Sequence, residues 1–113
     1  MLDACTTGQN PLNFPFFYTL DQDNDGLKLN WFRWTFCNPP YSQVSLWVEK
    51  AFNENKHRGI GIIMLLPSRT DTKWFHEFIY TNPRCEVRFL KGRLKFKGTK
   101  YPAPFPSMIV IFR

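Results

Sequence analysis

The sequence predicts an α/β protein with a mostly parallel sheet and an antiparallel edge near its carboxyl end. Up to about residue 80, segments with helical spacing of apolar residues alternate with short apolar runs, and β-prone runs dominate the rest. A hydrophobic content of 43% and an aromatic content of 18% are enough for a packed core. The length of 113 residues fits one small domain over residues 1–113.

The amino-terminal third predicts two short strands separated by a long loop. "MLDAC" (1–5) is typical of the end of a strand, and 6–30 is rich in turn-forming residues. "WFRWTFC" (31–37) is aromatic and β-prone, and turn residues follow it at once. We therefore expect the chain to turn sharply just after residue 37.

The middle third predicts a helix followed by a buried strand. Residues 42–56 carry apolar side chains at the spacing of one helical face: Val44, Trp47, Val48, Ala51 and Phe52. We expect Ser42 to cap this helix and Gly59 to end it. The continuous apolar run "IGIIMLLP" (60–67) is typical of a strand that is buried on both faces of a parallel sheet.

The last third predicts one further helix and three strands. A second helix is expected from about residue 70 to 80, with four inward side chains: Trp74, Phe75, Phe78 and Ile79. "CEVRFL" (85–90) and "RLKFKG" (93–98) flank Lys91-Gly92 and predict two strands around a turn. "SMIVIF" (107–112) predicts the terminal strand.

Composition limits the classes of protein to which this chain can belong. The net charge of +6 favours an anionic partner, of which nucleic acid is the commonest. The three cysteines are far apart and form no CxxC pair, which fits reduced thiols in the cytoplasm rather than a zinc ribbon or a disulfide framework. No apolar run reaches the roughly 20 residues that span a membrane, so no membrane partner is expected.

"DQDNDG" (21–26) begins like a calcium-binding loop but does not continue as one. Position twelve of such a loop should be a bidentate Glu, and here it is Phe32. No metal site is therefore expected, and an acidic surface loop or a carboxylate that holds a ligand remains open.

The motif "NPPY" combines Asn38, Pro39, Pro40 and Tyr41 where a strand ends and a helix begins. The Asn38 side-chain oxygen and the Pro39 carbonyl are two acceptors that could face both N–H groups of an exocyclic amino group. They would stabilise the positive charge that develops as the amino nitrogen attacks an electrophile. Tyr41 offers a flat face on which an extruded base can stack. The alternative is a stiff turn with no catalytic role.

Two further segments are candidates for substrate contact. "PSRTDTKWF" (67–75) follows the buried strand, and open α/β sheets bind ligands at the carboxyl ends of their strands. Arg69, Thr70, Asp71 and Lys73 lie in this segment, where Thr70 or Asp71 could instead cap the second helix. In the basic region from residue 84 to 100, three residues are candidates for contact with phosphates or for a solvated strand face: Arg93, Lys95 and Lys97.

Several stretches together resemble the phage-type Dam family of DNA adenine-N6 methyltransferases. "LDACTTGQN" is similar to the first cofactor motif, and "FYT" and "DNDGL" are similar to the segment before the catalytic strand. "CNPPYSQVSLWVEKA", "LLPSRTDTKWFHEFI" and "FPSMIVIF" follow in the family's order. The resemblance covers nearly the whole chain.

The resemblance implies a Rossmann-like methyltransferase sheet, S-adenosylmethionine as methyl donor and adenine in double-stranded DNA as substrate. It assigns Asn38 and Pro39 to the adenine amino group, Pro40 to the shape of the turn and Tyr41 to base stacking. The cofactor pocket would include Asp3, with Asn10 and Asp25 as further candidates. The segment from Arg69 to Trp74 would line the substrate side.

The family normally reaches the Leu-Asp pair after an upstream segment that completes the first strand. Only Met1 and Leu2 precede Asp3 here, so the resemblance implies a chain that is short at its amino end. We expect a monomer in the cytoplasm of a bacterial cell, encoded by a phage or prophage. A non-catalytic DNA-binding remnant and a cytosine-N4 methyltransferase remain the alternatives.

Overall fold

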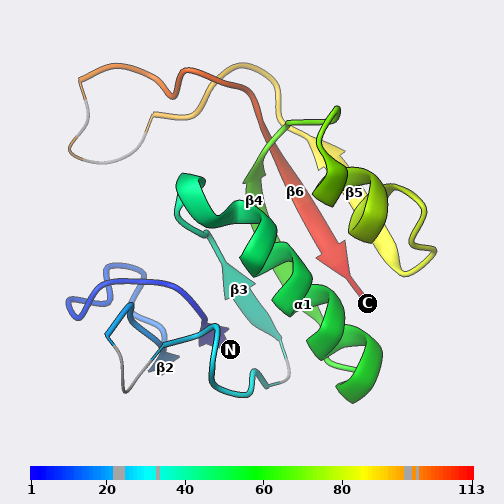
Figure 1. Ribbon diagram of the computed structural model, residues 1–113. Coiled ribbons are helices and arrows are strands. Elements are labelled where there is room, and N and C mark those ends of the chain that lie inside the picture. The colour runs from blue at the N-terminus through cyan, green and yellow to red at the C-terminus, as the bar shows by residue number, and fades with distance from the viewer. Residues whose placement is uncertain (22–24, 33, 96–97, 99) are drawn as a thin grey trace.

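The computed structural model describes residues 1–21, 25–32, 34–95, 98 and 100–113 and contains one six-stranded sheet (Figure 1). The strands in chain order are β1 (Leu2–Asp3), β2 (Phe16–Phe17), β3 (Thr35–Cys37), β4 (Ile62–Pro67), β5 (Cys85–Phe89) and β6 (Ser107–Phe112). The helical segments are the 3₁₀ turn η2 (Tyr41–Gln43), the α-helix α1 (Val44–Arg58) and the π-helix η3 (Phe75–Tyr80).

The spatial order of the strands is β2-β1-β3-β4-β6-β5. The sheet is parallel from β2 to β4, and β6 pairs in antiparallel fashion with both of its neighbours. The expected mostly parallel sheet with antiparallel carboxyl-terminal strands is therefore confirmed. Because β6 inserts between β4 and β5, the edge of the sheet is formed by β5.

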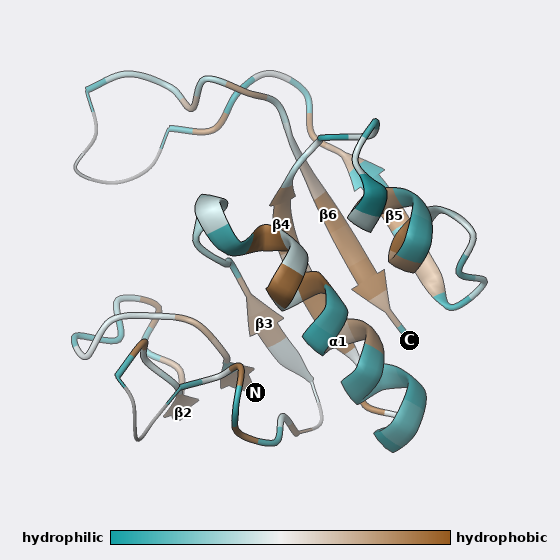
Figure 2. Ribbon diagram, in the orientation of Figure 1, coloured by the Kyte–Doolittle hydropathy of each residue, from teal (hydrophilic) through white to brown (hydrophobic). Residues whose placement is uncertain are grey.

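The core lies between this sheet and the two longer helical segments. The buried face of α1 carries Val44, Trp47, Val48 and Ala51, as the helical spacing predicted. These side chains pack on buried residues of the central strands, among them Cys37, Ile62, Met64, Leu66 and Met108. Figure 2 shows the same division, with brown central strands and largely teal outer turns of α1. Gly59 ends α1 with φ +69° and donates its N–H to the Asn55 carbonyl.

The cap expected at Ser42 is wrong. Ser42 lies inside η2, and the residue that precedes α1 is Gln43, whose side chain makes no cap hydrogen bond. The proline pair leads directly into the 3₁₀ turn, in which the Gln43 N–H donates to the Pro40 carbonyl at 3.0 Å. Backbone geometry therefore replaces the side-chain cap. At the second helix, Thr72 rather than Thr70 or Asp71 accepts from the Phe75 N–H, at 3.4 Å.

The second strand expected at 93–98 is also wrong for the residues described there, since 93–95 form no strand and 96–97 lie outside the described residues. The inner edge of β5 is already occupied by β6. Residues 93 and 94 bond instead to the proline-rich loop 101–106. The Ala103 N–H donates to the Leu94 carbonyl at 2.7 Å, and the Arg93 guanidinium donates to the Pro104 carbonyl at 2.9 Å.

Candidate active site

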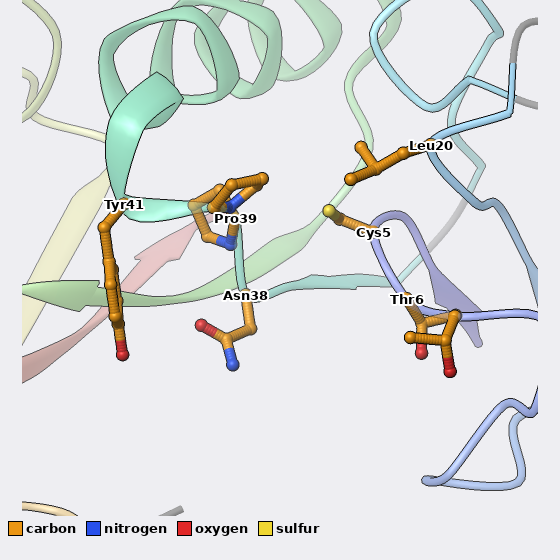
Figure 3. Close-up of a pocket in the computed structure, with 8 residues that line it drawn as sticks. Cys5, Thr6, Leu20, Asn38, Pro39 and Tyr41 are labelled. Carbon is orange, nitrogen blue, oxygen red and sulfur yellow. The ribbon is translucent and has the colours of Figure 1, made fainter.

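A pocket of about 280 Å³ opens at the carboxyl ends of β1 and β3 (Figure 3). One wall is the turn Asn38–Tyr41, and the other is formed by Cys5, Thr6, Thr7 and Leu20. The parallel pairing of Asp3 with Phe36 aligns the two strand ends at this edge of the sheet. The pocket therefore has the position at which open α/β sheets bind ligands.

The four residues of the motif occupy one side of this pocket. Asn38 follows the last residue of β3, and its amide group points into the opening beside the Tyr41 ring (Figure 3). Pro39 is buried, so its ring is fixed by packing as well as by its φ angle. The Pro40 carbonyl accepts from the Gln43 N–H, which fixes the direction of that carbonyl. The arrangement places the Asn38 amide and the Tyr41 ring at one opening, with both prolines in its wall.

Tyr41 is held from outside the motif by the proline-rich loop. The rings of Tyr41 and Phe105 meet edge to face, with centres 4.7 Å apart and planes at 84°. The Arg69 guanidinium lies over the Phe105 ring at 5.7 Å from its centre. Burial raises the pKa of the Tyr41 phenol, so the ring is neutral at physiological pH. The loop before β6 thus reaches the motif, and the segment after β4 reaches Phe105 of that loop.

Asp3 ends β1, two residues before the pocket wall begins at Cys5, and is not among the residues that line the pocket. Its side chain is 2% exposed, and burial raises the pKa of its carboxyl to about 6 although the Cys5 N–H donates to Oδ1 at 3.4 Å. The Tyr18 N–H donates to the Asp3 carbonyl at 2.9 Å, which closes the loop after β1 back onto the strand. A buried carboxylate with one hydrogen bond favours a cationic ligand, because a positive charge would offset its lost hydration.

Cys5 lies between the two acidic candidates. Burial and the nearby charges of Asp3 and Asp25 raise the pKa of the Cys5 thiol to about 11. The Cys37 thiol is fully buried, and its pKa is also well above the usual range. Both thiols are therefore protonated at physiological pH, and neither is an activated nucleophile.

Gly26 explains how Asp25 comes so close to the end of β1. A Cβ on Gly26 would lie 2.1 Å from the Ala4 carbonyl oxygen, so only glycine permits this approach of the two chain segments. The Gly26 carbonyl accepts from Trp31 Nε1 at 2.7 Å, and Asp25 accepts from the Leu27 N–H at 2.9 Å. Sequence reasoning noticed the Asp residues of this loop but overlooked the glycine that positions them.

Asn10 is engaged within its own loop. Its side-chain nitrogen donates to the Phe14 carbonyl at 2.7 Å and its oxygen accepts from the Phe14 N–H at 3.2 Å, while its φ is +47°. These bonds shape the loop that follows the pocket wall at Thr6 and Thr7. Each bond uses one of the two N–H groups or one of the two oxygen lone pairs of the amide, so these bonds do not by themselves prevent a contact with a cofactor.

The structure separates the residues of the segment 69–74. Arg69 faces Phe105 at the motif, whereas Lys73 and Trp74 line a different hollow against Ser45 and Glu49 of α1. Asp71 is exposed in the turn. Thr70 also lies away from the motif, where its carbonyl is 2.7 Å from the His76 ring nitrogen Nε2.

Two of the basic candidates near the carboxyl end, Arg93 and Lys95, do not line the pocket. Arg93 is exposed and bonds to the Pro104 carbonyl, and Lys95 is exposed without forming part of a strand. Lys97 lies outside the described residues. Phe105 is the functional candidate that sequence reasoning missed, and its only signal was its place in "YPAPFPS" just before the terminal strand.

The geometry fits the class indicated by the sequence, an amino-methyltransferase whose Asn-Pro-Pro-Tyr turn shares a pocket with the end of the neighbouring parallel strand. Residues 1–113 match the family model of DNA N-6-adenine-methyltransferases (Dam), and the chain belongs to this family.

A DNA N-6-adenine-methyltransferase of Escherichia phage T1 is 35% identical over 78 residues, which are 67% of this chain and 31% of the phage protein. The chain matches about a third of the length of this relative. Within the described residues, no helix is long and apolar enough to cross a membrane, and no group of three or more His, Cys, Asp or Glu side chains could hold a metal ion.

Proposed function

We propose that this chain forms the catalytic centre of a DNA methyltransferase that transfers a methyl group from S-adenosylmethionine to N6 of an adenine turned out of the duplex. The observation that carries the proposal is the shared pocket, in which the Asn38–Tyr41 turn faces the end of β1. The strand order, with β6 inserted between β4 and β5, supports a Rossmann-like methyltransferase sheet.

The acceptors of the turn are assigned to the amino group of the base. Asn38 Oδ1 and the Pro39 carbonyl each accept one of the two N–H groups, which orients the nitrogen lone pair toward the methyl donor and stabilises the charge that forms on the nitrogen. The end of β3 at Cys37 and the two prolines restrict the backbone that carries both acceptors, which supports this assignment. Positioning of this kind accounts for a large part of the rate in a direct transfer.

The ring of Tyr41 is assigned to stacking on the extruded base. In Figure 3 one face of the ring is turned toward Asn38. The edge-to-face contact with Phe105 restrains the ring in this orientation. A base stacked on Tyr41 would therefore bring its amino group toward Asn38.

The residues at the end of β1 fit one end of the cofactor. S-adenosylmethionine supplies a methyl group on a sulfonium centre and carries a cationic amino group. The Asp3 carboxylate and the neighbouring Asp25 are suited to positive charge, while Asn10 shapes the loop beside them. A pocket of about 280 Å³ is near the lower end of ligand sites, which span roughly 300–1,000 Å³. The pocket accommodates either one end of the cofactor or a base. It is too small for the whole cofactor and the base together.

Contact with DNA is assigned to basic groups around this opening. Arg69 is the best placed, since it lies over Phe105, which in turn contacts Tyr41. Thr70 and Asp71 lie in the exposed turn that follows it, and Lys73 and Trp74 support that turn from the side of α1. Further phosphate contacts are assigned to three basic residues near the carboxyl end: Arg93, Lys95 and Lys97. Such contacts would make DNA binding sensitive to salt.

The direct test is transfer of labelled methyl groups from S-adenosylmethionine to unmethylated DNA, followed by nucleoside analysis. We expect N6-methyl-2′-deoxyadenosine from the unsubstituted chain and none from Asn38→Ala, while circular dichroism shows the same fold. Asn53→Ala is the matched control, because Asn53 is an exposed asparagine in α1 away from the pocket.

Two other results would contradict the proposal. N4-methylcytosine as the product would show that the substrate base is cytosine and not adenine. Normal transfer by Asn38→Ala would remove the assigned role of the motif. A calorimetric titration with S-adenosylmethionine completes the test, since DNA binding without any cofactor binding would indicate a non-catalytic protein.

A further inference from the structure

The helix that follows β4 contains the π-helical segment η3, and a hollow of about 400 Å³ lies between this segment and β5. In Figure 1 the helix lies in front of β5, which forms the edge of the sheet. The described residues that line the hollow all belong to the range 70–89. We call this hollow the π-helix pocket. It shares no lining residue with the candidate active site.

The π-helix brings aromatic side chains together beside this pocket. In a π-helix the hydrogen bonds join residues five apart, so residues five apart lie one above the other. Phe75 and Tyr80 are such a pair, and their rings stack with centres 6.0 Å apart and planes at 26°. An α-helix would instead align residues three or four apart. Because π-helical turns are rare and frequently occur at functional sites, the pocket that this turn creates is a candidate ligand site.

The pocket has an apolar floor and an exposed aromatic ring on each of the two elements that form it. Ile79 of η3 is 1% exposed, and Val87 of β5 is partly buried. Tyr80 of η3 is 68% exposed, and Phe89 of β5 is 63% exposed. Apolar surface in contact with water is unfavourable, and a flat ligand between the two elements would remove part of both rings from water.

A few polar groups also line the pocket. His76 Nε2 is 2.7 Å from the Thr70 carbonyl oxygen, and a carbonyl only accepts, so Nε2 is the donor. In the neutral imidazole Nδ1 is then an acceptor, and the hydroxyls of Thr70 and Tyr80 can both donate and accept. The described lining includes no Asp, Glu, Lys or Arg. This chemistry favours an uncharged ring that has hydrogen-bonding groups on its edge.

We propose that the π-helix pocket binds a nucleobase, that is, an uncharged planar heteroaromatic ring with donors and acceptors on its edge. The faces of the base stack on the exposed rings of Tyr80 and Phe89, and its edge meets the polar groups of His76 and Thr70. The volume of about 400 Å³ lies within the range of roughly 300–1,000 Å³ that is usual for small-molecule sites.

The charges around β5 favour a ring attached to a phosphate group over an aromatic side chain of another protein. Residues 84–93 contain four basic residues and only Glu86 as an acidic residue. All four basic residues are exposed: Arg84, Arg88, Lys91 and Arg93. Because only Arg88 among them pairs with Glu86 in the described structure, the segment keeps a net positive charge. This charge attracts the phosphate of a nucleotide, whether the nucleotide is free or part of a strand.

Methyl NMR with 2′-deoxyadenosine as the probe tests the site. We expect the methyl resonances of Ile79 and Val87 to shift saturably, because both residues line the pocket and the ring current of a bound base acts on nearby methyl groups. The methyl resonances of Leu20 report separately on the candidate active site, which Leu20 lines. Shifts of Leu20 alone, or no saturable shift of Ile79 and Val87, would overturn the proposal. The test therefore does not depend on the proposed methyl transfer.

Substitutions of exposed rings provide a second test that leaves the core intact. Tyr80→Ala should weaken binding at the π-helix pocket by roughly tenfold, because it removes one stacking face. Tyr80→Phe keeps that face and should bind almost as well as the parent. Tyr101→Ala is the matched control, since Tyr101 is 72% exposed and does not line the pocket. Equal affinities of Tyr80→Ala and Tyr101→Ala would contradict stacking on Tyr80.

A short single-stranded oligodeoxyadenylate distinguishes the two sources of the base. If the oligonucleotide shifts the Ile79 and Val87 resonances at a lower concentration than the nucleoside does, the pocket receives a base that belongs to a strand, and the basic residues around β5 contact its phosphates. If only the nucleoside shifts them, the pocket is a site for a free nucleoside. Either result supports a nucleobase site in the π-helix pocket.

Discussion

The two walls of the candidate active site are built in opposite ways. The Asn38–Tyr41 wall is fixed by local chemistry, since two prolines and an immediate helix determine the turn. The wall after β1 depends on segments distant in the sequence. Gly26 presses against Ala4, Tyr18 bonds back to Asp3, and Glu54 of α1 holds the loop that contains Trp31. The catalytic wall should therefore tolerate distant changes, whereas the cofactor wall should be sensitive to them.

The largest effect is expected at Gly26. Its missing Cβ would lie 2.1 Å from the Ala4 carbonyl oxygen and 3.0 Å from the Trp47 ring. Gly26→Ala must push apart the loop and the end of β1, and should lower the free energy of unfolding by about 3 kcal/mol. Urea denaturation measures the change. Gly8→Ala is the matched control because nothing lies within 4 Å of its added Cβ. Equal stabilities of the two variants would contradict the proposed close contact.

The next effect concerns the buried carboxylate that ties α1 to the cofactor wall. Glu54 is 5% exposed, accepts from the Trp31 N–H at 3.3 Å and lies 2.7 Å from Lys50 Nζ. Its Oε2 is 3.2 Å from Arg58 Nε without hydrogen-bond alignment. Glu54→Gln leaves these cations without a counter-charge and should destabilise the fold by about 2 kcal/mol. The exposed Glu49→Gln on the same helix should change stability little.

The contrast between structure fixed by local chemistry and structure that depends on distant segments also explains what the sequence could predict. The helix over 42–56, the strand over 60–67 and the strand over 107–112 were predicted correctly because periodicity and local turn chemistry specify them. The strand expected at 93–98 was wrong for residues 93–95, because composition could not reveal that β6, from the chain end, pairs with β5 and that residues 93 and 94 bond to the loop 101–106. For the same reason the motif was found from the sequence, whereas Gly26 and Phe105 required knowledge of which segments meet.

The cofactor wall should also respond to pH through Asp3. Burial raises the pKa of Asp3 from 3.8 to about 6, so the folded state binds the proton more tightly than the unfolded state. The protonated carboxyl favours folding below about pH 4, and this advantage is lost as the pH rises through about 6. Asp3→Asn keeps an acceptor for the Cys5 N–H and should gain on the order of 2 kcal/mol relative to the parent above pH 6.

Unfolding at pH 4 and at pH 7.5 measures this difference. A stability gap between Asp3→Asn and the parent that does not change with pH would contradict the buried-carboxylate interpretation. Binding of S-adenosylmethionine should move in the opposite direction to stability. The proposed contact with a cation requires the charged form, so affinity should fall below about pH 6 in the parent and be uniformly weak in the variant.

The smallest effect is expected on the catalytic wall, at the contact between Tyr41 and Phe105. Phe105→Ala removes the edge-to-face partner of Tyr41, which contributes about 1 kcal/mol, while the prolines still hold the turn. We therefore expect kcat/KM for methyl transfer to fall by about tenfold or less, with unchanged affinity for S-adenosylmethionine. Tyr101→Ala, an exposed aromatic residue of the same loop, should have no such effect. If Phe105→Ala abolished transfer as completely as Asn38→Ala, the ring would act on the substrate directly, and the catalytic wall would depend on distant segments as much as the cofactor wall does.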